Sequence, residues 1–158
     1  MMSNILIEYQ YFGCVNYINT LFQCSNIEFE VCESFQKMSF RNRMVVAGSN
    51  GLVHLSVPLE KGRDQKQPLR DVRISYALPW QQQHCRTIES CYSRSPYYEF
   101  YRDGLQAIYS RKHLFLIDLN REVRDWLWKV LKIPSGFSET QIFRLQKCQY
   151  SDTYIQYR

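Results

Sequence analysis

The feature that constrains the fold most is a pair of β-rich runs joined by a tight-turn signal. The runs "RMVVA" and "LVHLSVPL" flank Gly48-Ser49-Asn50-Gly51, and Asn-Gly between such runs is among the strongest signals for a β-hairpin. From Pro79 onward the apolar residues recur at the spacing of helices instead. The sequence therefore predicts a hairpin in the middle of the chain and helices after it.

The segments before the hairpin predict a strand, a helix and a second strand. "NILIEY" is typical of a buried strand, and "CVNYINTLFQ" has apolar residues at helical spacing. "IEFEV" alternates apolar residues with Glu28 and Glu30, which predicts a half-exposed strand. After the hairpin, "LRDVRISY" alternates again and predicts a strand that continues the hairpin as a meander.

Three further helices are predicted after Pro79. "PWQQQHCRTIESCY" places Trp80 and His84 on one helical face, and "SPYYEFY" starts a helix with Ser95 as the N-cap and Pro96 at the first position. "LNREVRDWLWKVLKI" is the last and ends before Pro134.

This order predicts an α/β fold, with α+β as the alternative. We expect one domain over residues 1–158, with a central sheet, a hairpin or meander, and about four helices in two or three layers. Residues 134–158 show no clear period and cannot be placed.

The composition excludes several classes of protein. With 45% hydrophobic and 22% charged residues the chain resembles a soluble globular protein. It has no signal-peptide pattern and no membrane span, so we expect a cytoplasmic protein. The six cysteines form no C-x-x-C pair, which predicts reduced thiols and no zinc or other metal site. No nucleotide, hydrolase or protease motif is present; the cofactor is unknown, as is the oligomeric state.

The positive charge is concentrated in the middle of the chain. Residues 36–73 contain eight Lys or Arg and three Asp or Glu, a net charge of +5, whereas residues 1–35 have a net charge of −4. Such a field attracts anions, including phosphates, carboxylates and nucleic acid. The alternative is that these charges only solvate an exposed β-surface.

Three groups of residues are candidates for a site. In an extended segment Arg41 and Arg43 would point to one face, with Asn42 on the other, so that both guanidiniums could hold one anion; a surface strand with ion pairs is the alternative. His84, one turn from Trp80, could act as a general acid or base, or be a core residue. The tyrosines could stack a ring or belong to the core; they are Tyr92, Tyr97, Tyr98 and Tyr101.

Several spaced motifs resemble those of a known family. "YFG", "ESFQKMSFRNRMVVAGSNGLVHLSVPLEK", "LRDVRIS" and "PWQQQHCRTIESCYSRSPYYEFY" are similar, in the same order, to the WbqC-like proteins of bacteria, in particular the form found in Bacteroidetes. The resemblance covers roughly residues 5–133. Cys85 stands where an aromatic residue is common in that family, which argues against Cys85 as a required nucleophile. The end of the chain resembles a shortened or divergent member. The positions that the resemblance marks are Gln36, Lys37, Arg41, Asn42, Arg43, Pro58, Lys61, Trp80, His84, Tyr92, Pro96 and Tyr98.

The family name implies a link to cell-surface polysaccharide of the O-antigen type, and the family's biochemistry is poorly defined. We therefore expect a transferase-type enzyme that uses an anionic small molecule, such as a nucleotide sugar or an acyl donor. Arg41, Asn42, Arg43 and Lys61 would hold the donor, and His84 would move a proton. Trp80, Tyr92 and Tyr98 would form the walls of the pocket. The alternatives are a non-catalytic nucleic-acid-binding module and an assembly protein of a polysaccharide operon.

Overall fold

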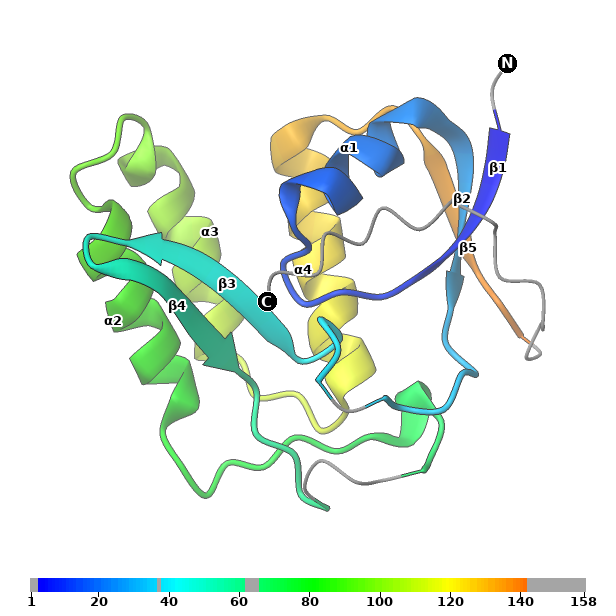
Figure 1. Cartoon of the computed structure of the whole chain (residues 1–158), viewed down its shortest axis with the longest axis horizontal. Helices are drawn as coiled ribbons and strands as arrows, with labels where there is room; N and C mark the ends of the chain where they lie inside the picture. Colours follow the sequence, from blue (N-terminus) through cyan, green and yellow to red (C-terminus); the bar gives the residue numbers. More distant parts are fainter. Residues whose placement is uncertain (1–2, 37, 62–65, 142–158) are drawn as a thin grey trace.

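The computed structural model describes residues 3–36, 38–61 and 66–141, and its larger sheet is parallel (Figure 1). Its strands are β1 (Ser3–Glu8), β2 (Cys24–Glu30) and β5 (Gly136–Glu139), with β2 in the centre. Parallel neighbours require crossover connections. Helix α1 (Val15–Gln23) provides the first, and the chain enters β5 after helix α4 (Leu116–Leu131). Figure 1 shows both helices on the same side of the strands.

The predicted hairpin is present and forms a sheet of its own. β3 (Arg43–Gly48) pairs antiparallel with β4 (Gly51–Ser56), and Ser49 and Asn50 make the two-residue turn. Gly51 has a φ of 123°, a conformation that side chains rarely adopt. The hairpin buries Met44, Val46 and Leu55.

Helices α2 (Trp80–Tyr92) and α3 (Tyr98–Ser110) complete the other half of the molecule. Helix α2 contacts β3 and α3, and α3 contacts α4; Figure 1 shows the hairpin crossing in front of α2 and α3. The described residues thus form four α-helices, one parallel sheet and one antiparallel hairpin, which confirms the α/β class. None of the helices in these ranges is long and apolar enough to cross a membrane.

The predicted third strand of the meander is wrong. Leu69–Asp71 form a short 3-10 helix, η1, and residues 73 and 74 make only isolated bridges. The backbone there pairs with other loops instead of β4, because Ile74 donates to the carbonyl of Leu114 at 3.1 Å and Glu60 donates to that of Arg73 at 3.1 Å. The hairpin therefore has no third strand within the described ranges.

Three local expectations also need correction. The N-cap of helix α3 is Tyr97, in the left-handed conformation, and not Ser95. The carbonyl of Ser95 accepts a hydrogen bond from the amide of Tyr98 and so closes the turn before the helix. Glu30 is buried, because Thr140 beyond β5 donates to its carboxylate at 2.8 Å. The unplaced tail supplies β5, a strand too short to recognise without its pairing to β2. The remainder of that tail, residues 142–158, lies outside the described residues.

Candidate functional site

Arg41 is buried between two carboxylates at the carboxyl end of the parallel sheet. Its Nη2 lies 2.9 Å from Glu8 Oε2 and 2.6 Å from Glu33 Oε2. Glu8 is the last residue of β1, and Glu33 follows β2. The arginine is only 1% exposed. Because two carboxylates already neutralise the guanidinium, an anionic ligand would have to displace one of them to bind it.

Two buried asparagines hold the backbone on either side of that guanidinium. Asn42 donates from Nδ2 to the carbonyl of Val57 at 3.0 Å, while the amide of Val57 donates to the carbonyl of Asn42 at 2.8 Å. Asn120 of α4 donates from Nδ2 to the carbonyl of Arg41 at 3.0 Å. Asn42 therefore fixes the entry into β3, and its amide is not open to a ligand.

His84 belongs to a buried polar cluster with two tyrosines. Its Nδ1 lies 3.0 Å from the hydroxyl of Tyr11, which in turn lies 2.7 Å from that of Tyr109. The ring of Trp80 packs edge-on against the imidazole, at 5.2 Å between centroids. Burial lowers the pKa of His84 to about 4, although a backbone hydrogen bond at Ser56 opposes this. The imidazole is therefore neutral near neutral pH.

The structure brings Arg41, Asn42 and His84 into one continuous buried seam between the two halves. The amide of Tyr11 donates to the carbonyl of Phe40 at 2.9 Å, and its hydroxyl contacts His84. Asn42 bonds to Val57, and the adjacent residue, Ser56, makes a backbone hydrogen bond with His84. The seam therefore aligns the hairpin and α2 with the sheet, and its polar groups face one another rather than solvent.

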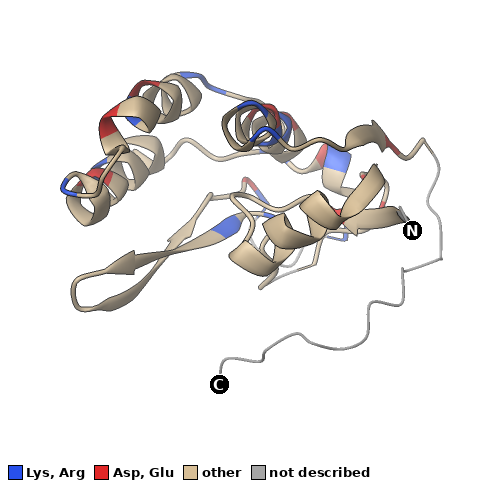
Figure 2. Cartoon of the chain, turned by 90° about the horizontal axis from the view of Figure 1, so that it is seen from above, with Lys and Arg blue, Asp and Glu red and all other residues tan. Residues whose placement is uncertain are grey.

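Arg43 and Lys61 lie outside this seam. Arg41 is buried against Glu8 and Glu33, whereas Arg43 lies beside the next strand, so the two guanidiniums do not converge on one anion. Arg43 lies 3.4 Å from Nδ1 of His54 on the neighbouring strand. It is the only charged residue of β3 and β4, and Figure 2 shows the rest of the hairpin without charge. Lys61 is exposed, with Nζ 3.4 Å from Oε1 of Gln67.

The predicted aromatic residues do not surround one open pocket. Trp80 is buried and 2% exposed. The hydroxyl of Tyr92 accepts a hydrogen bond from the amide of Ala47 at 2.9 Å, and so covers the outer edge of β3. Tyr98 is half-buried and packs against the core. Of the three, Tyr92 lies nearest to an open cavity, because Ala47 lines one.

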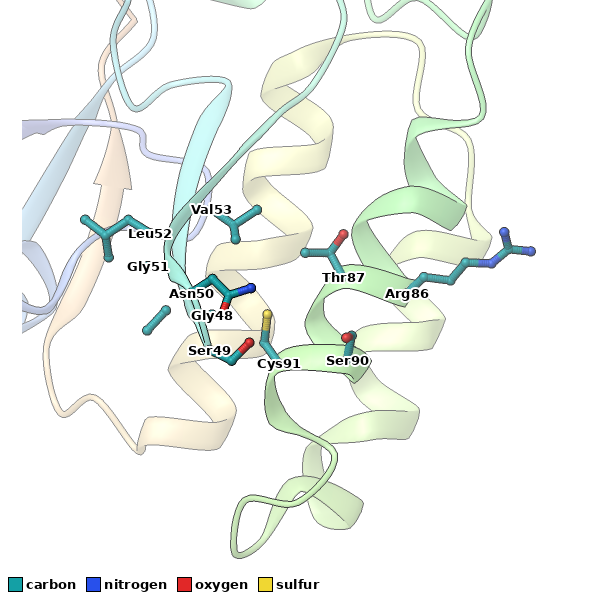
Figure 3. A pocket seen from close by; sticks show the side chains of 11 residues that line it. Gly48, Ser49, Asn50, Gly51, Leu52, Val53, Arg86, Thr87, Ser90 and Cys91 are labelled. Atoms are coloured by element: carbon teal, nitrogen blue, oxygen red, sulfur yellow. The ribbon is translucent and has the colours of Figure 1, made fainter.

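That cavity, which we name the hairpin groove, lies between the hairpin turn and α2 (Figure 3). Its volume is about 680 Å³. In Figure 3 the thiol of Cys91 points toward the hairpin, whereas the side chain of Arg86 extends away from it. No Asp or Glu lines the groove, and Arg86 has no ion pair or hydrogen bond within the described ranges. The groove is lined by residues 47–53 of the hairpin and by Arg86, Thr87, Ser90 and Cys91 of α2.

The sequence analysis missed most partners of the buried seam. Glu8 lies near the end of the first predicted strand, and Tyr11 follows it. The end of a parallel strand commonly contributes to a site, so this position could have indicated both residues. Tyr109 and Asn120 carry no such signal, because each is one polar residue on a helix. In the described part of the chain, no three metal-ligating side chains gather around a common point.

Comparison with known proteins identifies the family. No curated protein and no solved structure matches the chain. The model of the WbqC-like protein family matches residues 9–157, and so continues past residue 133, where the resemblance in motifs ends. With nearly the whole chain matched, the protein belongs to the WbqC-like protein family.

Proposed function

We propose that this protein is a transferase-type enzyme that takes an anionic activated donor, such as a nucleotide sugar or an acyl donor, for surface polysaccharide biosynthesis. The hairpin groove carries the proposal. Its volume of about 680 Å³ falls within the range of small-molecule pockets, roughly 300 to 1,000 Å³. Its lining offers hydroxyl and amide groups, no carboxylate, and one cation, Arg86, that has no partner among the described residues. The polysaccharide context is what the family name implies.

Arg86 is the group we assign to the donor's anion. Its guanidinium has no partner in the described ranges, so binding an anion would break no existing ion pair. The side chain extends away from the hairpin in Figure 3, and a change of rotamer, which is fast for an exposed side chain, would bring it over the groove. Arg41 lacks this freedom, because Glu8 and Glu33 already hold it.

His84 does not line the groove, but it would move the proton from a position one turn before Thr87 on α2. His84, Thr87 and Cys91 are spaced by three and four residues and therefore share one face of α2, the face toward the hairpin. The imidazole is neutral, and its Nδ1 shares a hydrogen bond with the hydroxyl of Tyr11, through which a proton would pass. Because burial makes this imidazole a weak base, the contribution of His84 would grow when its surroundings open to water. Its 3% exposure means that the hairpin would have to shift before a donor reached it.

The test is thermal stabilisation of the purified protein by nucleotide sugars, acyl-CoAs, nucleotides and short oligonucleotides, each in turn. A bound ligand raises the melting temperature by mass action. We expect a shift with one small-molecule class that is lost in Arg86→Gln and kept in Arg70→Gln. The second variant removes the same charge from an exposed arginine outside the groove.

Arg43→Ala and Lys61→Ala examine the cations predicted from the sequence. If Arg43→Ala abolishes the shift and Arg86→Gln does not, the anion binds on the outer face of the hairpin. Stabilisation by oligonucleotides alone, weakening steeply with salt, would favour the nucleic-acid-binding alternative. No shift with any compound would leave the groove without a donor and contradict the proposal.

An assembly protein is the second candidate. Tyr97, which caps α3, and Phe100, in the first turn of that helix, are 71% and 80% exposed, with ring centroids 6.2 Å apart. Exposed aromatic pairs are typical of protein–protein contacts. If assembly is the function, Phe100→Ser should abolish co-purification with an operon partner, and no small molecule should raise the melting temperature of the natural protein.

A further inference from the structure

A surface far from the hairpin groove combines exposed leucines with cations. Leu78, before α2, is 65% exposed, and Leu114, between α3 and α4, is 52% exposed. Arg111 and Lys112 are exposed beside Leu114 in the same loop. These four residues are named the leucine patch. Exposed apolar side chains next to cations are typical of a surface that binds something both apolar and anionic.

The two segments of the leucine patch are held together by hydrogen bonds. The amide of His113 donates to the hydroxyl of Tyr76 at 2.8 Å, and that hydroxyl lies 2.9 Å from the carbonyl of His113. Gln81 donates from Nε2 to the carbonyl of Arg111 at 2.5 Å. Figure 1 shows the α3–α4 loop running beside the segment that leads into α2. The leucines therefore project from a fixed backbone.

Near the patch two cations, Arg111 and Lys112, outnumber the carboxylate of Glu122, with which Arg111 is paired. The side chain of Arg111 is 68% exposed, and Nζ of Lys112 lies 5.4 Å from the centre of the Tyr76 ring. The nearby carboxylate of Glu122 is 18% exposed and already holds two partners, Arg111 at 2.8 Å and His113 at 2.5 Å. The patch thus presents two leucines and two cations, and one of the cations, Arg111, shares its charge with Glu122.

We propose that the leucine patch docks the protein on an anionic lipid surface. Cations are drawn to acidic headgroups, and short apolar side chains on fixed loops can enter the boundary between headgroups and acyl chains. Phe100 and Tyr97 are more exposed, but the charges beside them are balanced, with Glu99 and Arg102 paired at 3.8 Å. The leucine patch has an ion pair too, between Arg111 and Glu122, but Lys112 adds a cation beyond it. Charge therefore selects the leucine patch as the contact. This inference does not depend on the proposed donor.

Co-sedimentation of the full chain with lipid vesicles tests the proposal. The vesicles are made of phosphatidylcholine alone, or of phosphatidylcholine mixed with phosphatidylserine. We expect binding to the mixed vesicles that weakens as salt is raised. The double variant Leu78→Ser/Leu114→Ser should bind them roughly tenfold less, since two apolar side chains no longer leave water. Arg111→Gln/Lys112→Gln should lose a similar factor.

Phe100→Ser is the matched control, because it removes a larger exposed apolar side chain outside the patch. It should bind mixed vesicles like the natural protein. Thermal unfolding of each variant shows whether it is folded, and Leu78→Ser and Leu114→Ser alone replace the pair if it is not. Equal binding to both vesicle types, full binding by the leucine variants, or a loss in Phe100→Ser as large as theirs would overturn the proposal.

Discussion

Lowering the pH should destabilise the protein through His84. The pKa of this imidazole is about 4 in the folded protein and about 6.5 when unperturbed. The unfolded chain therefore takes up a proton between these values and the folded chain does not. The stabilisation from the neutral imidazole is complete above about pH 6.5 and is lost as the pH falls toward 4. The difference between the two pKa values corresponds to about 3 kcal/mol in the free energy of unfolding.

Urea unfolding at a series of pH values from neutral to about 4 measures this loss. His84→Gln keeps a polar side chain but cannot titrate, so its free energy of unfolding should fall by about 3 kcal/mol less over the range. His54→Gln, at an exposed position, should keep the full pH dependence. If His84→Gln and the natural protein show the same slope, or if proton NMR places the pKa of His84 near its ordinary value, the buried-imidazole argument is refuted.

Three further changes examine other contacts. Arg41→Met should lower the free energy of unfolding by about 3 kcal/mol in urea titrations, because two carboxylates lose their shared cation, whereas Arg43→Met should change it little. Tyr92→Phe should cost about 1 kcal/mol by leaving an edge amide of β3 unpaired, measured by thermal unfolding; an unchanged melting temperature would contradict this role. Hydrogen bonds from Arg121 lower the pKa of Glu139 to about 2. The natural protein should therefore lose stability as the pH falls from about 4.5 toward 2. In circular-dichroism melts over this range, the melting temperature of Glu139→Gln should fall less than that of the natural protein.

The sequence predicted those parts of the fold that local patterns determine. The hairpin around Ser49 and Asn50 and the helix carrying His84 were predicted correctly, because turn chemistry and helical spacing act within a few residues. The strand expected over residues 69–76 was predicted wrongly. The alternating apolar pattern also fits a segment whose backbone pairs with loops. β5 has only four residues, and its pairing to β2 decides its conformation.

Some of the predicted site residues lie together, but their contacts could not be predicted. Arg41, Asn42 and His84 share one seam, yet each already has a partner inside the protein. The carboxylates that hold Arg41 come from β1 and from the loop after β2, so only the tertiary fold reveals that its charge is already neutralised. The hairpin groove depends on the distance between a turn and a helix, for which no pattern in the sequence exists.

The position of β5 in the chain has a consequence for folding. The central strand of the parallel sheet ends at Glu30, and its outer neighbour begins only at Gly136, after the hairpin and three helices have been made. Such a high contact order slows folding, because a long loop must close before the last pairing forms. On the ribosome, β2 would wait with one edge unpaired until β5 emerged. The edge of β2 is therefore where we expect a nascent chain to be most prone to aggregation.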